Sequence, residues 1–279
     1  MTTIRIAFSP DSDDAFMFMP LLEGKVPARG FAFEASRADT ESLNALAERG
    51  EIDVVAVSMA QYARVADRYL LLPHGASVGR GYGPVVVSRE PRTLESLHHA
   101  RIAIPGRRTT AALVTGLLVP DFEAVEIPIV PYRAVFDAVK RGEVDAAVVI
   151  HEGRLLYEAE GLHAVCDLGV EWHAQTGLPL PLGGNAIRRG LGADVIRQVS
   201  AACAESIAWA LDHRDAMMEA LQAEGGVLDR RGLDRYLAMY ANEDTRGMKD
   251  DVRAAVAELF KRGATRGLVP SGATPELAP

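Results

Sequence analysis

The pattern of apolar and polar positions predicts strands that alternate with helices. Residues 4–8 alternate and are rich in β-branched side chains, and the run stops at Ser9-Pro10, which predicts a strand that ends in a turn. Residues 31–34 predict a second short strand, and Asp39-Thr40 are expected to begin a helix with one apolar face. Strands and helices in this order are typical of an α/β protein.

One segment of this pattern occurs twice. The residues RGEIDVVAVS at 49–58 and RGEVDAAVVI at 141–150 each follow an amphipathic helix, and each continues into an apolar run typical of a strand covered on both faces. Two such units predict two α/β lobes, although two βα units can also resemble each other by chance. Because ligands of α/β sheets bind beyond the carboxyl ends of the strands, we expect Ser58 and His151, which leave the two runs, at a cleft between the lobes.

The chain is expected to cross between the lobes twice. Residues 84–88 predict a strand that carries it into the second lobe, and residues 183–187 predict the return strand. We therefore predict a discontinuous lobe one, residues 1–87 and 187–279, with lobe two formed by residues 88–186.

The C-terminal third of the chain is predicted to be helical. Its apolar periodicity predicts helices over residues 195–213, 216–223, 233–240 and 250–261. The tail from Pro270 holds three prolines and few apolar residues, so we expect it to be loose.

Composition limits the partners and the compartment. The chain has 279 residues and a formal net charge of −8, which argues against nucleic acid or an anionic membrane surface as partner but leaves room for a small anionic ligand held by local donors. No run approaches the roughly 18 apolar residues of a membrane span. The N-terminus lacks the pattern of a secretory signal, and the two cysteines, Cys166 and Cys203, stand in unrelated contexts. We therefore expect a cytoplasmic protein with reduced thiols; the oligomeric state is not predicted.

The residues PGRRTT predict an anion-binding turn. Thr109 and Thr110 stand where a strand gives way to a helix, and hydroxyls together with free N–H groups at a helix N-terminus attract negative charge. The alternative is that Thr109 only caps the helix. The glycine and lysine spacing of a P-loop is absent.

His151 is the candidate general base. A histidine at the end of a strand that faces a cleft can exchange protons near neutral pH. The alternative is a structural histidine bonded to a backbone carbonyl. Glu152 follows directly, but adjacent residues on a strand point to opposite faces, so no His–Glu dyad is predicted.

Two further segments carry charges that could serve a site. The acidic turn at residues 11–14 is expected to cap a helix, with cation binding as the alternative. The glycine-rich segment at residues 75–84 is either a loop beside the cleft or a flexible crossover. Arg80 within it could meet a ligand carboxylate.

Several motifs together resemble one family. SPDSDDAFMF, GRGYGPVVV, PGRRTTA, IHEGR and DLGVEWHAQTGLPLPLGG stand in the order and spacing of the 1,4-dihydroxy-6-naphthoate synthases, over residues 4–268. The resemblance implies a periplasmic-binding-protein-like (type II) fold used as an enzyme. It also implies a lyase-type fragmentation of cyclic dehypoxanthine futalosine to 1,4-dihydroxy-6-naphthoate in menaquinone biosynthesis, without metal or organic cofactor.

The resemblance also implies roles for single residues. The proton-accepting histidine of the family falls on His151. The substrate-contacting positions fall on Ala56, Val57, Ser58, Thr109 and Thr110, and Asp14 and Arg80 are added as candidates. One segment departs from the family pattern: Ser-Pro-Cys-Pro-Asn-Asp-Thr-Phe is replaced by Ser-Pro-Asp-Ser-Asp-Asp-Ala-Phe, which adds two carboxylates. The substrate could therefore be a relative of the family's molecule.

Three other functions fit parts of this pattern. A non-catalytic binding protein for a small carboxylate would share the fold. Chorismate dehydratase, the sister enzyme of the same pathway, would share fold and pathway, but the IHE and GLPLPLG motifs favour the synthase. An effector domain of a transcription factor is disfavoured, because no helix-turn-helix segment or basic patch is present.

Overall fold

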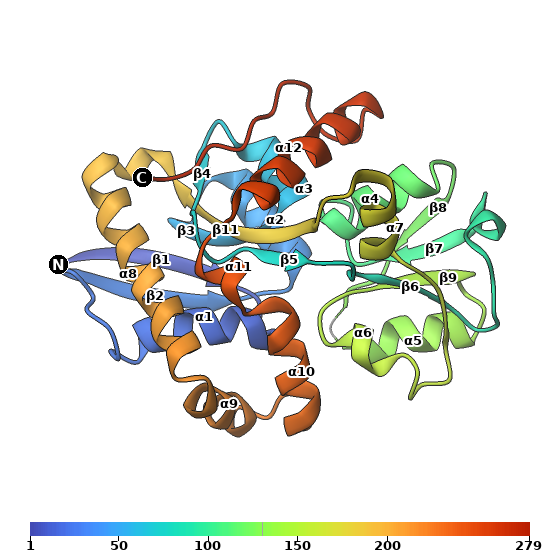
Figure 1. Cartoon of the computed structure of the whole chain (residues 1–279), viewed down its shortest axis with the longest axis horizontal. Helices are drawn as coiled ribbons and strands as arrows, with labels where there is room; N and C mark the ends of the chain where they lie inside the picture. Colours follow the sequence, from blue (N-terminus) through green and yellow to red (C-terminus); the bar gives the residue numbers. More distant parts are fainter. Residues whose placement is uncertain (130) are drawn as a thin grey trace.

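Two β-sheets divide the molecule into two lobes that lie side by side (Figure 1). The computed structural model describes residues 1–129 and 131–279. The strands of the first sheet are β1 (Thr2–Phe8), β2 (Phe31–Arg37), β3 (Val54–Ser58), β4 (Tyr69–Leu71), β5 (Ser77–Gly79) and β11 (Leu180–Arg188). Those of the second are β6 (Val85–Ser88), β7 (Arg101–Ile104), β8 (Glu123–Glu126), β9 (Ala146–Val149) and β10 (His163–Asp167).

Both sheets mix parallel and antiparallel pairs. The first has the order β2-β1-β3-β11-β4, with β5 also paired to β11, and the second has the order β10-β6-β9-β7-β8. The β1, β2 and β3 strands are mutually parallel where they pair, and so are β7, β8 and β9. The antiparallel strands are β11 in the first sheet and β6 in the second. The expected two-lobed α/β class is confirmed.

Helices cover both faces of each sheet (Figure 1). The helices of the first lobe that precede the crossing are α1 (Ser12–Leu22), α2 (Thr40–Arg49) and α3 (Met59–Val65). Those of the second lobe are α4 (Thr110–Leu118), α5 (Tyr132–Lys140), α6 (Gly153–Leu156) and α7 (Leu168–Thr176), with a 3₁₀ turn at Leu94–Leu97. After a 3₁₀ turn at Arg189–Leu191 follow α8 (Ala193–Asp212), α9 (Arg214–Ala223), α10 (Arg230–Tyr240), α11 (Glu243–Arg246) and α12 (Asp250–Thr265).

Strand alternation sends neighbouring side chains into different cores. Ile6 of β1 packs with α1, α8, α9 and α10, whereas the adjacent Ala7 packs with α2, α3 and α12 on the other face. In the second lobe Val87 faces α5 while Val86 faces α4 and α7. Each strand is apolar on both sides because both of its faces are covered.

The repeated segment forms the same local structure in each lobe. Gly50 and Gly142, both with φ of +71°, end the preceding helices in the left-handed conformation that favours glycine. Asp53 then accepts the N–H of Arg5 at 2.9 Å, and Asp145 accepts the N–H of Arg101 at 2.9 Å. In each lobe the aspartate thus ties the incoming strand to its parallel neighbour, which fixes where the strand ends and its last residue emerges.

The two crossings lie at the junctions of the sheets. β6, over residues 85–88, pairs within the second sheet, and β11, over residues 180–188, pairs within the first. The lobe boundaries at residues 87/88 and 186/187 stay a prediction. By strand pairing, the chain passes into the second sheet between β5 and β6 and returns to the first between β10 and β11, a few residues before each of these positions.

The C-terminal tail is held in place, so the expectation of a loose tail is wrong. The N–H of Leu71 donates to the carbonyl of Glu276 at 2.9 Å, and the N–H of Ala278 donates to the carbonyl of Leu71 at 2.7 Å. Glu276 also pairs with Arg189 at 2.8 Å. The tail has few apolar residues, but it is held in place because its backbone forms hydrogen bonds with β4, which is otherwise an edge strand.

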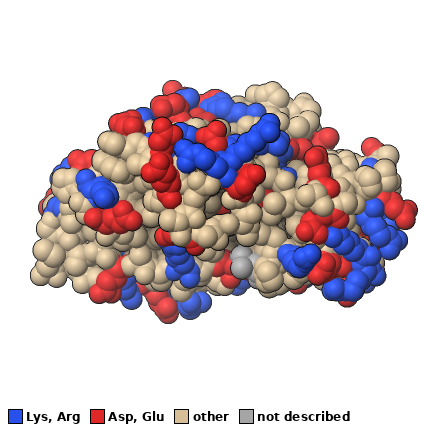
Figure 2. All heavy atoms as spheres, turned by 90° about the horizontal axis from the view of Figure 1, so that it is seen from below, with Lys and Arg blue, Asp and Glu red and all other residues tan. Residues whose placement is uncertain are grey.

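Charges of both signs are interspersed on the face shown in Figure 2. Neighbours of opposite sign form surface ion pairs, for example Arg107 with Glu126 and Arg141 with Glu143. Among the described residues, we find no helix with the length and apolar character needed to cross a membrane.

Candidate active site

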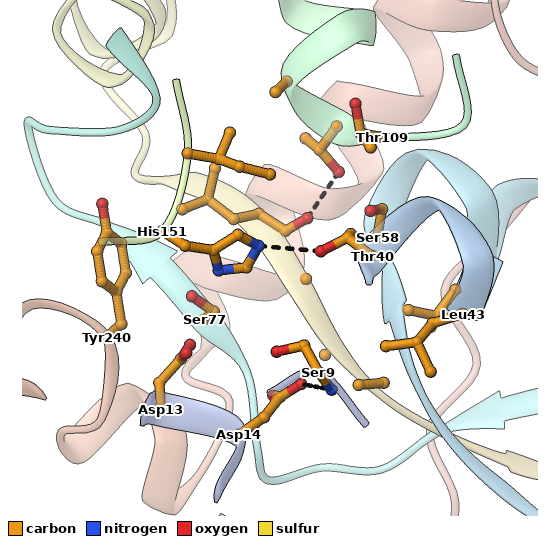
Figure 3. Close-up of a pocket in the computed structure, with 18 of the residues that line it drawn as sticks. Ser9, Asp13, Asp14, Thr40, Leu43, Ser58, Ser77, Thr109, His151 and Tyr240 are labelled. Carbon is orange, nitrogen blue, oxygen red and sulfur yellow. Dashed lines mark hydrogen bonds between the residues drawn. The ribbon is translucent and has the colours of Figure 1, made fainter. Parts of the chain in front are cut away.

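A cavity lies where the two lobes meet. It has about 760 Å³ of atom-free space, including its open mouth. Its walls combine strand ends and helix N-termini from both lobes with α10 (Figure 3). The polar residues that line it are Ser9, Asp13, Asp14, Thr40, Ser58, Ser77, Thr109, Thr110, His151, Tyr236 and Tyr240. No lysine or arginine is among its lining residues in the part of the chain that the structure describes.

Most of the predicted site residues meet at this cavity. Those that line it are Ala56, Val57, Ser58, Thr109, Thr110, Asp14 and His151. They come together because β3 and β9 end at the same gap between the sheets. Arg80 does not line the cavity.

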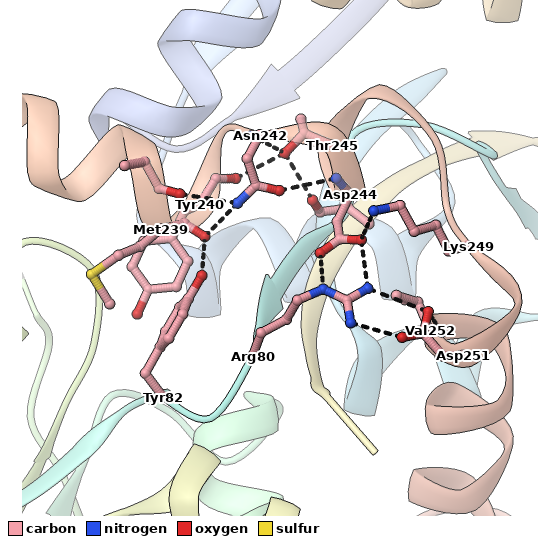
Figure 4. A network of polar contacts seen from close by, with 12 residues as sticks. Arg80, Tyr82, Met239, Tyr240, Asn242, Asp244, Thr245, Lys249, Asp251 and Val252 are labelled. Carbon is pink, nitrogen blue, oxygen red and sulfur yellow. Dashed lines mark hydrogen bonds and ion pairs between the residues drawn. The ribbon is translucent and has the colours of Figure 1, made fainter. Parts of the chain in front are cut away.

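Arg80 does meet carboxylates, but they belong to the protein itself (Figure 4). Its guanidinium donates to both oxygens of Asp244, at 2.6 and 2.8 Å, and to Asp251 at 2.7 Å. The carboxylate of Asp244 is only 4% exposed, so it needs this partner. The prediction that Arg80 binds a ligand carboxylate is therefore not supported, because α11 and α12 already occupy the guanidinium.

The hydroxyl end of the cavity is formed by Ser58, Thr109 and Thr110. Thr109 caps α4 by accepting the N–H of Ala112 at 3.1 Å, and its hydroxyl donates to the carbonyl of Gly106 at 2.8 Å. The hydroxyl of Thr110 donates to the carbonyl of Leu182 at 2.6 Å. Both threonine hydroxyl hydrogens are therefore used within the protein. What this end offers an anion is the start of α4, where the N–H groups of Thr110 and Ala111 have no acceptor among the described residues.

Ser58 keeps a donor for a ligand. Its Oγ accepts from the amide of Asn44 at 3.1 Å, and its own N–H donates back to Asn44 at 3.0 Å. The Asn44 side chain is fully buried, so this pair fixes the end of β3 where α3 begins. The hydroxyl hydrogen of Ser58 has no acceptor among the described residues.

The acidic end lies opposite, where Asp11, Asp13, Asp14 and Glu152 surround His151; Figure 3 shows Thr109 above, Asp13 and Asp14 below, and His151 between them. Asp11 takes the N-cap position of α1 but makes no side-chain cap bond. The capping prediction is therefore wrong: these side chains turn toward the cavity and the second lobe, where other donors hold them.

The donors that hold them are two tyrosines from distant elements. Tyr132 of α5 lies 3.0 Å from Asp11, and Tyr236 of α10 donates to Asp13 at 2.8 Å. Asp11 and Asp13 are buried, with 5% and 4% exposed. Burial of a carboxylate is unfavourable unless donors compensate it, and these hydroxyls do so in part.

Asp14 is the carboxylate of this end best placed to titrate near neutral pH. Its Oδ2 accepts the N–H of Ser9 at 2.8 Å. Burial and the charge of Asp13 raise the pKa of Asp14 to about 7. Burial likewise raises the pKa of Asp13. Part of this end is therefore protonated at neutral pH.

His151 stands in a strained backbone conformation. Its φ is +49°, which for a residue with a Cβ costs about 1–2 kcal/mol. Its Nε2 lies 3.0 Å from the hydroxyl of Thr40, and its Nδ1 lies 3.3 Å from Asp11 and 3.4 Å from the hydroxyl of Tyr236. The ring is 21% exposed, toward the cavity. Arg29 and His99 also have a positive φ, but of these three residues only His151 lines the cavity.

The charge on His151 is favoured by its surroundings. Burial would lower the pKa of His151, but the neighbouring carboxylates, Asp11 foremost, outweigh it and raise the pKa above the ordinary value of 6.5. In the free protein His151 therefore keeps its second proton to a higher pH than an ordinary histidine, whereas a simple base needs the neutral ring.

Glu152 belongs to the same network without forming a dyad with His151. Strand β9 ends at Val149, so the alternation argument does not apply to residues 151 and 152, which lie in the turn before α6. Glu152 is buried and accepts from the N–H and the hydroxyl of Ser12, at 3.0 and 2.8 Å. Burial, followed by the charge of Asp11, raises the pKa of Glu152.

Sequence reasoning missed Thr40, Tyr132 and Tyr236. Thr40 was expected only to begin α2, which it does, with Asp39 as the cap. The tyrosines carry no local signal, since Tyr236 and Asp13 are 223 residues apart. Within residues 1–129 and 131–279, no group of three or more histidine, cysteine, aspartate or glutamate side chains is arranged to hold a metal ion.

The chain was compared with known families and proteins. The family model described as menaquinone biosynthesis matches residues 4–265. A protein from Streptomyces coelicolor is 38% identical over 272 residues, which cover 96% of this chain and 95% of the relative. One from Thermus thermophilus is 38% identical over 268 residues, with 96% of each chain covered. Both relatives are named 1,4-dihydroxy-6-naphtoate synthase.

Solved structures share the architecture. Protein AF1704 from Archaeoglobus fulgidus aligns with a TM-score of 0.90 and 43% identity, over 96% of this chain and 98% of its own. The alkanesulfonate-binding protein SsuA from Xanthomonas axonopodis pv. citri, bound to MOPS, aligns with a TM-score of 0.72 and 17% identity, over 99% and 96% of the two chains. The second likeness shows the periplasmic-binding-protein fold alone. With a family model matched over almost its whole length and two such relatives, this chain belongs to the menaquinone biosynthesis family.

Proposed function

We propose that the protein is a 1,4-dihydroxy-6-naphthoate synthase, a carbon–carbon lyase that fragments cyclic dehypoxanthine futalosine. The observation that carries the proposal is His151: a strained histidine whose Nε2 is directed at Thr40 on the cavity wall, opposite a helix N-terminus suited to an anion. The names of the two 38% identical relatives support the reaction. They also favour it over chorismate dehydratase, which the family description alone does not separate.

The substrate would lie across the cavity. Its carboxylate would meet the first turn of α4 and the hydroxyl of Ser58. Its reacting portion would then face His151. Nε2 would take a proton from the bound substrate, and the electron pair left behind would break the bond to the ribose-derived portion and leave the aromatic naphthoate. Since the cavity has no lysine or arginine among its described lining residues, backbone N–H groups provide the anion contact.

The raised pKa of His151 adds a condition. The base needs a free lone pair on Nε2. Because the carboxylates around the ring raise the pKa of His151, the ring loses its proton only at a higher pH than an ordinary histidine. We therefore expect kcat/KM to rise with pH through this elevated pKa.

A binding protein without catalysis is the second candidate, because SsuA shares the fold. The strained histidine among four carboxylates disfavours it, since tight binding of an anion gains nothing from negative neighbours. The cytoplasmic location predicted above remains part of the proposal, in keeping with relatives named as biosynthetic enzymes.

The test is a turnover assay with cyclic dehypoxanthine futalosine, in which 1,4-dihydroxy-6-naphthoate is detected by chromatography. We expect turnover by the unchanged protein and a loss of about 10²- to 10⁴-fold in kcat for His151→Ala. His151→Asn is a second variant, because asparagine tolerates a positive φ. His163→Ala, at an exposed position on β10, is the matched control and should keep full activity. Full activity in both His151 variants, or tight binding of the substrate without product, would refute the proposal.

A further inference from the structure

The surroundings of His151 decide which ring nitrogen carries a hydrogen. Tyr236 donates its single hydroxyl hydrogen to Asp13, 2.8 Å away. Toward Nδ1, at 3.4 Å, it therefore offers only a lone pair. The other neighbour of Nδ1 is Oδ2 of Asp11 at 3.3 Å, which is also an acceptor. Two acceptors on one side of the ring require a hydrogen on Nδ1.

Asp11 in turn depends on this ring. Its Oδ2 is buried and meets no hydrogen bond of good geometry among the described residues, and Nδ1 of His151, 3.3 Å away, is the ring nitrogen in contact with it. An uncompensated buried carboxylate is unfavourable. The contact therefore favours a hydrogen on Nδ1, directed at Oδ2 of Asp11.

The orientation of Asp11 is set from its other side. Oδ1 of Asp11 and Oε2 of Glu152 lie 3.0 and 2.9 Å from the same hydroxyl of Tyr132. Burial and both carboxylates raise the pKa of Tyr132 well above its ordinary value of 10.0, so the hydroxyl keeps its one hydrogen. That hydrogen makes a full hydrogen bond to only one carboxylate, so a proton on the other carboxyl group would complete the second contact.

Glu152 is the carboxyl group suited to hold that proton. Ser12 already donates to Oε1, which leaves Oε2 free to be the protonated oxygen. The raised pKa of Glu152 supports this assignment. The donors then run in one direction: Glu152 donates to Tyr132, and Tyr132 donates to Asp11, whose remaining oxygen faces Nδ1.

We propose that Asp11 is a positioning residue for His151, which holds the hydrogen on Nδ1 and so leaves Nε2 as the nitrogen that exchanges a proton with the substrate. The identity of that substrate rests on the proposed function; the tautomer does not. At position 11 this chain has an aspartate where the pattern of the resembling family has a cysteine. The arrangement therefore belongs to this chain's own N-terminal turn.

Other groups also face the ring, and the test has to separate them. Asp13 and Asp14 approach from α1, Thr40 from α2, Tyr236 from α10, and Glu152 from the next position in the chain. Among the carboxylates, Asp11 makes the largest contribution to raising the pKa of His151 and is the one in contact with Nδ1.

The test combines ¹⁵N NMR of His151 with the pH dependence of kcat/KM. In Asp11→Asn, Tyr132 continues to donate to the side-chain oxygen, which turns the amide N–H₂ toward Nδ1. A donor at that place favours the hydrogen on Nε2 instead. We expect a reversed neutral tautomer, a pKa of His151 lower by about one unit, and a 10- to 100-fold lower limiting kcat with KM changed less than threefold.

Two further variants make the result decisive. Asp11→Cys removes the charge with a small side chain and keeps the test open should Asp11→Asn fail to fold; it should lower the pKa of His151 similarly. Asp121→Asn removes the carboxylate 2.8 Å from surface His98 and is the matched control, which should leave His151 unchanged. An unchanged tautomer and pKa of His151 in a folded Asp11 variant would overturn the proposal. The NMR measurement needs no substrate, so it stays decisive even where cyclic dehypoxanthine futalosine is not turned over.

Discussion

The two ends of the cavity are built on opposite principles. At the hydroxyl end, Thr109 and Thr110 bond to backbone groups and Ser58 to an asparagine, and none of the three hydroxyls titrates in the physiological range. At the acidic end, the groups around His151 are ionisable and hold one another across the gap between the lobes. The first end therefore presents the same field across the physiological pH range, while the second changes its charge with pH.

The largest effect on this comparison is expected from Thr110→Val at the hydroxyl end. The variant removes the donor to the carbonyl of Leu182 and the acceptor of the Ala60 N–H, which leaves two backbone groups without partners. We expect a loss of about 2–3 kcal/mol in the free energy of unfolding and an about tenfold higher KM at unchanged pH dependence. Urea denaturation and steady-state kinetics measure both.

Thr115→Val is the matched control for this variant. Its hydroxyl only bonds back to the carbonyl of Ala111 within α4, at 2.8 Å. We expect a loss below about 1 kcal/mol and no change in KM. A KM that stays the same in Thr110→Val would show that the Thr110 hydroxyl is not needed to position the start of α4 for the substrate.

A smaller effect is expected from Arg80→Ala, which touches neither end. The variant leaves the buried Asp244 with Lys249 at 3.6 Å as its remaining cation. Because Arg80 itself is 39% exposed, solvent screens part of the loss, and we expect about 1–2 kcal/mol of destabilisation with kcat and KM unchanged. Arg107→Ala, at an exposed pair, is the control and should cost less than about 1 kcal/mol. A tenfold rise in KM for Arg80→Ala would contradict this expectation and indicate that Arg80 contributes to substrate binding.

The smallest effect is expected from Asp14 on the pH dependence of stability. Its folded-state pKa of about 7 lies above the ordinary value of 3.8, so the folded protein binds this proton more tightly than the unfolded chain. That contribution is present at low pH and is lost as the pH rises through 7. In Asp14→Asn we expect the decline in stability between about pH 4 and pH 7, the two pKa values of this group, to flatten by about 0.3–0.5 kcal/mol per pH unit, because the coupled carboxylates share the titration. Urea midpoints at constant ionic strength test this; an unchanged slope would contradict it.

The sequence predicted the residues whose neighbours are close in the chain. The repeated segment placed Ser58 and His151 at one cleft, because in each copy an aspartate three residues after the helix-ending glycine ties the strand to its parallel neighbour. The helical C-terminal segment followed from its periodicity. These features rest on local rules, so the pattern was sufficient.

The residues that sequence reasoning misplaced have partners far along the chain. Arg80 meets Asp244 across 164 positions, and Asp11 meets Tyr132 across 121. In the sequence, an aspartate or an arginine looks the same whether its side chain binds a ligand or another residue of the protein. The strain at His151 was equally hidden, since a histidine in the sequence does not by itself indicate a positive φ.

The position of β11 has a consequence for synthesis on the ribosome. The first sheet needs β11 between β3 and β4, yet β11 begins only at Leu180, after all the strands of the second lobe have been made. The second lobe, from β6 to β10, is a continuous stretch of chain whose strand partners are all present earlier. Since domains fold as their segments emerge, the inserted lobe is complete first and the lobe that contains the N-terminus is completed second. The cavity, which needs walls from both lobes, can therefore form only at the last stage, when the two lobes meet.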